Sequence, residues 1–257
     1  MGFLVTEILD AVMIEIKIKT NFAAALKSLD AQYKKQIPFA TSKAINEIAK
    51  TAQREVVSEM KAKFDRPTPF TLNSTFIKFS TKHNLTARIY IKDRELMKSK
   101  SLADSIGHQF GGGKRIRTRL EYWLQNAGYI SSNEYVVAAS GAKLDQYGNI
   151  GRGEIQRVLS QLRAGPDAAS YRTGSARSKS KRAVAGYFWS RGGKLARGVW
   201  QRTAFAQGSS VKPVLIVVAA PTYQQRINME AIGQRVVARD FQSEFAKQFA
   251  FAVRTAR

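Results

Sequence analysis

The sequence of 257 residues contains no cysteine and two histidines, and its 19 acidic residues stand against 42 Lys and Arg. Without cysteine the chain forms no disulfide and no thiolate metal site. Its apolar runs are short. Glu7 and Asp10 interrupt the N-terminal one, and the longest elsewhere covers residues 214–220, well below the ~20 residues of a membrane-spanning helix. We therefore expect a soluble protein with no export signal and no membrane partner.

The shortage of acidic residues gives a formal net charge of +23 and a pI near 10.4. A magnitude of about 2–8 is enough to keep a small domain in solution, so solubility alone does not account for this charge. A field of this sign attracts polyanions, which makes nucleic acid or an acidic protein surface the expected partner. Apolar residues make up 44% of the chain, which is sufficient for a folded core.

Basic residues are concentrated between Arg152 and Lys212, where only Glu154 and Asp167 oppose them. Aromatic residues are interleaved with these cations, a mixture that suits phosphate neutralisation with some stacking. In the alternative interpretation, these aromatics belong to the core. The sequence has no helix-turn-helix, zinc-finger or RNA-binding signature, so any contact with nucleic acid is expected to be independent of base sequence.

Hydrophobic periodicity predicts the secondary structure. Strands are expected at residues 14–19, 75–80, 86–91, 135–139, 186–190 and 213–220. Helices are expected after residue 21, at 38–63, at 154–162 and at 228–255, with Pro38 ending the first of them or opening the second. Long helices at both ends that enclose mostly sequential strands predict an α+β fold with a mostly antiparallel sheet, rather than a doubly wound fold.

Residues 107–128 form the stretch around which we expect the chain to be organised. A glycine-rich basic turn leads into a short amphipathic helix that carries Ile116, Leu120 and Leu124 on one face. The turn is not a nucleotide-binding loop, because His108 stands where a glycine is required and Arg115 where Ser or Thr is required. It either contacts phosphate non-specifically or packs tightly against the sheet. Its candidate DNA- or partner-binding residues are Lys114, Arg115, Arg117 and Arg119.

A second basic region covers residues 164–182, with Asp167 as its one acidic residue. We expect a flexible loop that orders on meeting an anion and that is the one internal hinge in a single α+β domain spanning residues 1–257. Residues 1–12 are expected to be an N-terminal appendage, with Met13 as an alternative start. Further candidate binding residues are Arg172, Arg177, Lys179, Lys181 and Arg182 in the loop, and Arg191, Lys194 and Arg197 in a second glycine-spaced turn.

No set of residues has the spacing of a catalytic or metal site. His83 and His108 are each expected at a surface or a cap rather than on a metal. The carboxylates and lysine of residues 93–98 lack the spacing of a nuclease site, and the composition of residues 145–149 is typical of a turn, although its oxygens also suit calcium. The serines have no G-x-S-x-G pattern. We expect a binding or structural protein rather than an enzyme, with no cofactor and no metal.

One segment resembles a known family. Ile37-Pro38-Phe39-Ala40 followed by Ala44-Ile45-Asn46 resembles the N-terminal helix of the minor tail protein Z family of lambda-like phages. Later segments are similar to larger prophage structural proteins: His108-Gln109 with Gly112-Gly113, Lys143-Leu144-Asp145 with Tyr147-Gly148-Asn149, and Gly198-Val199-Trp200-Gln201-Arg202. The chain is longer than the lambda-type proteins and differs from them in its glycine-rich centre.

This resemblance implies a tail-completion or neck protein that joins the tail to the head, as a homo-oligomeric ring around the DNA channel. Its partners would be other phage structural proteins, such as the portal, an adaptor, the tail tube or a terminator, and it would reside in the virion after synthesis in the host cytoplasm. The alternative is a non-sequence-specific nucleic-acid-binding protein that acts in the cell. An assembly protein should expose apolar residues for its neighbours to cover, whereas a free DNA binder should not.

Overall fold

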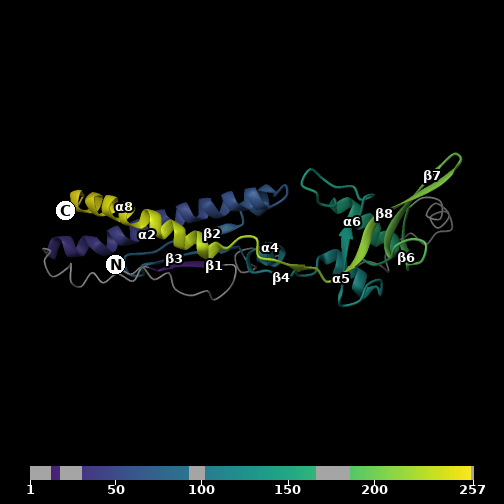
Figure 1. Cartoon of the computed structure of the whole chain (residues 1–257), viewed down its shortest axis with the longest axis horizontal. Coiled ribbons are helices and arrows are strands. Elements are labelled where there is room, and N and C mark those ends of the chain that lie inside the picture. Colours follow the sequence, from purple (N-terminus) through teal and green to yellow (C-terminus); the bar gives the residue numbers. More distant parts are fainter. Residues whose placement is uncertain (1–12, 18–30, 93–101, 166–185, 256–257) are drawn as a thin grey trace. The chain divides into compact units, whose positions relative to one another are not determined.

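Helices and antiparallel sheets form the α+β fold that the sequence predicts (Figure 1). The structure is a computed structural model that describes residues 13–17, 31–92, 102–165 and 186–255. As expected, two long helices, α2 (Ala31–Lys63) and α8 (Met229–Arg254), flank the strands. The N-terminal appendage expected at residues 1–12 lies outside the described residues, as does most of the helix expected after residue 21.

The chain divides into two compact units, where the sequence predicts one domain. Unit 1 comprises residues 1–115 and 223–257, and unit 2 comprises residues 116–222. The chain crosses between them next to β4 (Gly113–Lys114) and β9 (Thr222–Tyr223), which pair in a two-stranded sheet. Because strand residues rather than a long polar linker mark the boundary, composition gives no sign of it. The expected hinge at residues 164–182 falls within the sequence of unit 2 and, from residue 166, outside the described residues.

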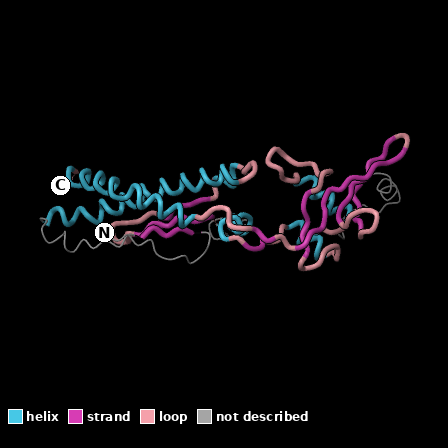
Figure 2. The backbone as a smooth tube through the Cα atoms, in the orientation of Figure 1, coloured by secondary structure: helices cyan, strands magenta, loops and turns pink. Residues whose placement is uncertain are grey.

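In unit 1, α2 and α8 lie along each other on a three-stranded antiparallel sheet in the order β1–β3–β2 (Figures 1 and 2). The strands are β1 (Met13–Lys17), β2 (Thr75–Lys78) and β3 (Thr86–Ile91). Small buried residues of α2, among them Ala44 and Ala52, allow α8 to approach closely. The Glu55 carboxylate of α2 pairs with Arg235 and Arg239 of α8 at 2.9 and 2.8 Å, which links the two helices beside this core.

The expected helix boundary at Pro38 is wrong, because α2 runs through this proline. Proline removes one backbone hydrogen bond and crowds the preceding turn. On either side of it, however, Ile37 and Ala40 are buried in the unit, and the Thr41 hydroxyl donates to the Ile37 carbonyl at 2.8 Å. Burial on both sides of the proline thus keeps the helix continuous. At the other end, α2 stops at Lys63, as the prolines at 67 and 69 predict.

Unit 2 is built on a four-stranded antiparallel sheet in the order β5–β8–β7–β6. The strands are β5 (Glu134–Ala138), β6 (Gly186–Ser190), β7 (Gly198–Phe205) and β8 (Gly208–Ala219). Two helices, α5 (Arg119–Asn126) and α6 (Arg152–Leu162), share its core with the strands through Leu124, Val158, Val199 and Leu215. The sequence analysis did not predict β7, and β8 starts earlier than expected.

Residues 107–128 do not form one turn followed by one helix. Helix α4 (Leu102–Gly111) contains the first two glycines, and the chain changes direction only at Gly112 and at Gly113, the first residue of β4, which have φ of +73° and +87°. The amphipathic helix starts at Arg119, and Ile116, expected on its apolar face, is 56% exposed. The capping interaction that begins α5 at Thr118 decides this boundary. The predicted stop is confirmed at Gly128, which has φ of +75°.

The short helix α3 (Pro69–Leu72) follows the break after α2. The hairpin predicted at residues 75–91 is confirmed, with Ile77 opposite Ile89 in the pairing of β2 and β3. The final helix begins near the expected residue 228, where the Asn228 side chain accepts the Ala231 amide at 2.9 Å and caps the helix. Along α8, Phe241, Phe245 and Phe249 are successively stacked at centroid distances of 6.0 and 5.9 Å, so the predicted four-residue spacing forms a continuous aromatic row.

Candidate polyanion- and partner-binding surface

Unit 2 has few acidic residues, and the fold withdraws most of them from its surface. Residues 116–222 include 16 Lys and Arg against 5 Asp and Glu. Of the four acidic residues that the structure describes here, Glu121 and Glu154 are buried and Glu134 pairs with Arg197. Asp145 is exposed, but its carboxylate accepts the amides of its own turn at 2.9 Å. The described surface of unit 2 therefore has a larger excess of positive charge than the residue counts of the unit indicate.

The buried Glu121 carboxylate connects α5 to the sheet. It accepts the Thr118 amide and hydroxyl, both at 2.8 Å, and so completes the capping box at the start of α5. Its second oxygen accepts the Val136 amide of β5 at 3.0 Å. One carboxylate thus accepts hydrogen bonds from two backbone amides in different elements. Its negative charge lies in the interior of the unit rather than on its surface.

The second buried carboxylate, Glu154, joins α6 to β6. It accepts the Tyr187 hydroxyl at 3.0 Å and the Lys143 amide at 3.2 Å. Burial, together with the neighbouring Glu154 carboxylate, raises the pKa of Tyr187 to about 12. The Tyr187 phenol therefore remains a hydrogen-bond donor at every physiological pH, which suits a structural role.

Two of the candidate cations, Arg117 and Arg197, hold the segment between α5 and β5. The Arg117 guanidinium lies 4.8 Å from the Tyr135 ring centroid and donates to the carbonyls of residues 131 and 132. The Arg197 guanidinium binds the Glu134 carboxylate and the Tyr129 carbonyl, the latter at 3.0 Å. The backbone and side chain of residue 131, and Arg197, hold the pKa of Glu134 below its usual range. Both arginines are engaged by their own unit.

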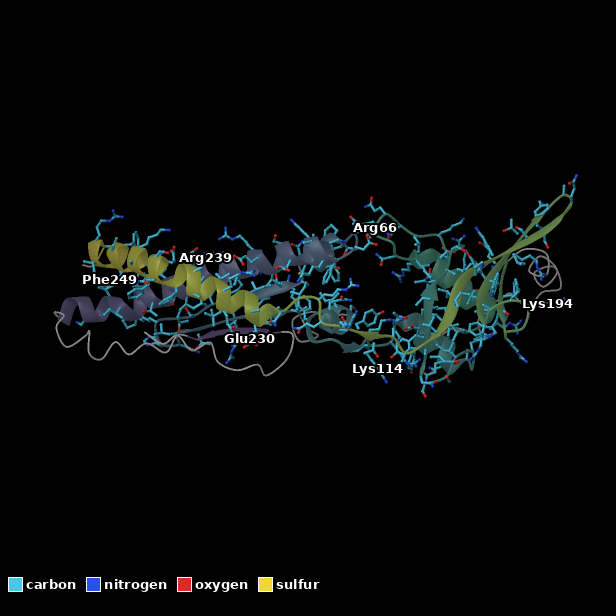
Figure 3. The ribbon with its side chains drawn as sticks, viewed as in Figure 1. Arg66, Lys114, Lys194, Glu230, Arg239 and Phe249 are labelled. Carbon is cyan, nitrogen blue, oxygen red and sulfur yellow. The ribbon has the colours of Figure 1, made fainter. Side chains whose placement is uncertain are left out.

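Three other candidates in unit 2 are exposed: Arg119 at the start of α5, and Arg191 and Lys194 in the turn from β6 to β7 (Lys194 is labelled in Figure 3). None of the three forms an ion pair with a described residue. The turn itself is ordered by Ser190, whose hydroxyl donates to the Leu195 carbonyl at 3.1 Å and accepts the amide of residue 192 at 3.3 Å. A fixed turn thus presents Arg191 and Lys194 to solvent.

The candidates Lys114 and Arg115 belong to unit 1 rather than unit 2. Lys114 is exposed on β4 (Figure 3), and Arg115 is half-buried. Next to them, the His108 ring packs on Tyr223 at a centroid distance of 4.5 Å. Burial lowers the pKa of His108, and the charges of Arg115 and Arg226 lower it further. This neutral, aromatic packing favours the tight structural turn over a phosphate site.

The remaining candidates cannot be placed. Arg172, Arg177, Lys179, Lys181 and Arg182 lie outside the described residues.

Among the part of the chain that the structure describes, no three His, Asp or Glu side chains gather where they could hold a metal ion. No described helix combines the length and the apolar composition that a membrane span needs.

The sequence analysis missed the outer end of the β7–β8 hairpin, which projects beyond the other strands of its sheet (Figure 1). Strand β6 pairs with β7 only as far as Arg202, and residues 203–205 pair only with 208–210 of β8. Residues 203–211 are exposed and uncharged, with Phe205 58% and Val211 39% exposed. The one sequence signal was Gly208 after a short polar turn, which is too common to identify a hairpin by itself.

Comparison with protein-family models, with curated proteins and with solved structures finds no match for this chain.

Proposed function

We propose that this chain is a structural virion protein of a tailed phage, a tail-completion or neck component that joins the tail to the head. In this proposal, several copies form a ring around the DNA channel and contact neighbours such as the portal, an adaptor, the tail tube or a terminator. Three features support it: the resemblance of the segment at residues 37–46 to minor tail protein Z, the uncharged hairpin end with its exposed Phe205 and Val211, and the cationic surface of unit 2.

The end of the β7–β8 hairpin is the observation that carries the assembly role. Residues 203–205 and 208–210 pair with each other and with no other described strand, and an isolated two-stranded ribbon is marginally stable. Phe205 leaves more than half of its surface in water. Covering an exposed phenylalanine contributes about 1.5–3 kcal/mol. Because this end has no charge, a neighbouring protein can cover it without desolvating an ion.

The cationic surface of unit 2 gives the second part of the role. Arg119, Arg191 and Lys194 are exposed, and the buried glutamates do not neutralise them at the surface. In a symmetric ring every copy repeats the same charges around the axis, so modest charges on one subunit add up along enclosed DNA or against acidic neighbours.

The same surface supports a second candidate, a non-sequence-specific nucleic-acid-binding protein that acts in the cell. Cations without acidic neighbours neutralise phosphates regardless of base sequence, and the resulting affinity falls steeply with salt. This candidate does not explain why the uncharged end of the hairpin exposes Phe205 and Val211. The two proposals therefore differ in whether Phe205 matters for association with protein.

The test is to measure mass and shape by light scattering and negative-stain microscopy, for the purified chain alone and with purified tails or virions. We expect a ring, or saturable attachment to one end of the tail. Phe205→Ser should weaken that association, whereas Phe70→Ser, at a side chain that is 57% exposed on α3, is the matched control and should not. A monomer that ignores tails and shifts DNA in a salt-dependent way would favour the cellular nucleic-acid binder.

A further inference from the structure

A cleft of about 720 Å³ opens in unit 1 beside the C-terminal half of α2. Its walls come from that half of α2, from α3 and from the adjoining ends of β2 and β3. None of the described candidate binding residues considered above belongs to its lining. The lining residues used below are Arg54, Val57, Lys61, Leu72, Asn73 and Lys92.

Three cations face this cleft. Arg54 and Lys61 are seven residues apart on α2, so they lie on the same side of the helix and about 10.5 Å apart along its axis. Lys92 follows β3, and its ammonium donates to the Asn73 carbonyl at 2.8 Å. The Lys92 amide also donates to the Ser74 carbonyl at 2.8 Å, which anchors that side of the cleft. The cations therefore come from two elements, and Lys92 is held in place.

Among the residues that the structure describes, no carboxylate lines the cleft, and the carboxylates at positions 55, 59 and 65 are already paired. Glu55 binds two arginines of α8 at 2.9 and 2.8 Å. Glu59 binds Lys63 at 2.9 Å, and Asp65 binds its neighbour in sequence at 3.1 Å. The three cations of the cleft, in contrast, form no ion pair with a described residue. The cleft thus concentrates positive charge that nothing in the described chain neutralises.

The rest of the lining indicates the kind of anion. Val57, Leu72 and Pro69 supply an apolar strip among the cations, and none of the described lining residues is aromatic. The described lining therefore offers no stacking platform for a nucleic-acid base. The side-chain amide of Asn73, also part of the lining, suits the backbone of an extended peptide. The volume of the cleft, about 720 Å³, lies within the range of clefts that bind ligands.

We propose that this cleft binds an acidic peptide segment of a partner protein, with carboxylates on the cations at 54, 61 and 92 and an aliphatic side chain on the Val57–Leu72 strip. The complementary charge gives selectivity and fast association, and the aliphatic contact separates this peptide from other polyanions. The inference does not depend on the proposed virion role, because it requires only an acidic segment.

The test uses the purified full chain and a fluorescein-labelled peptide of sequence Glu-Leu-Glu-Glu-Leu-Glu, followed by fluorescence anisotropy at 150 mM salt. We expect saturable binding that weakens at least tenfold in the double variant Arg54→Gln, Lys61→Gln. The matched control, Lys43→Gln with Lys82→Gln, removes the same charge from exposed positions of unit 1 and should change the Kd less than twofold. Thermal melts should show that both variants remain folded.

Three outcomes would overturn the proposal. Equal weakening in both double variants would mean that the peptide responds only to the overall charge of the chain. Equal affinity for Glu-Ser-Glu-Glu-Ser-Glu would mean that the apolar strip is not used. Displacement of the peptide by oligo(dT) at the same concentration as by unlabelled peptide would assign the cleft to single-stranded nucleic acid. None of these results depends on whether the chain attaches to tails.

Discussion

Replacing Glu121 by alanine should destabilise unit 2 and leave unit 1 unchanged. The carboxylate is fully buried and accepts the Thr118 and Val136 amides at 2.8 and 3.0 Å. Alanine removes this acceptor from both amides, at about 1–3 kcal/mol each. Alanine also removes the cost of burying the Glu121 charge, and this gain offsets part of the loss. We therefore expect a net loss of about 3 kcal/mol in the free energy of unfolding of unit 2.

The chain allows the two units to be followed separately during urea unfolding. All three tryptophans, at positions 123, 189 and 200, lie in unit 2, so tryptophan fluorescence reports on that unit. Circular dichroism at 222 nm reports mainly on unit 1, whose helices α2 and α8 have 33 and 26 residues. With a denaturant slope of about 2 kcal/mol per molar urea, the fluorescence midpoint of Glu121→Ala should fall by about 1.5 M.

Glu134→Ala is the control, because Glu134 is also in unit 2 but forms a partly exposed ion pair with Arg197. Such pairs contribute about 0–1 kcal/mol, so its fluorescence midpoint should fall by less than 0.5 M. A shift in Glu121→Ala no larger than that of the control would refute the role assigned to the buried carboxylate. An equal fall in the dichroism midpoint would instead show that the two units unfold together.

Three further predictions concern single features of the fold. Gly198→Ala should destabilise unit 2 by about 3 kcal/mol or more, because φ is +151° and the new Cβ would lie 2.1 Å from the Leu215 carbonyl oxygen; an unchanged fluorescence midpoint in urea would contradict this. Burial opposes the charge of Glu55, but the two α8 arginines outweigh it and lower its pKa from 4.5. That stabilisation is complete well above pH 4.5 and is lost as the pH falls through the lower folded pKa. Glu55→Gln should therefore lower Tm at pH 7, with a loss of less than about 1 kcal/mol in the free energy of unfolding, and this effect should shrink as the pH falls below 4.5; an effect that does not change with pH would refute it. The double variant Arg191→Gln, Lys194→Gln should lower the slope of log K against log salt for duplex DNA by up to about 2 without changing Tm, and an unchanged slope would remove these cations from the binding surface.

Much of the local structure follows from the sequence by itself. Apolar alternation identified the β2–β3 hairpin, and prolines 67 and 69 identified the end of α2, because both signals act on neighbouring residues. The start of α8 also agrees with the helix expected at residues 228–255. The excess of cations was also evident from composition. These features need no long-range contact, so periodicity, caps and charge counts are sufficient to predict them.

Tertiary structure decided the remainder. Pro38 lies inside α2 because the residues around it are buried, and the division into two units follows from contacts between residues far apart in the sequence, since residues 1–115 and 223–257 form one unit. The roles of the arginines depended on distant partners: Arg197 binds Glu134, 63 residues away, while Arg191, six residues before it, forms no ion pair with a described residue. A count of charges treats these two arginines alike. Only the fold brings a carboxylate to one of them and leaves the other in solvent, and it therefore determines which cations remain to meet a partner.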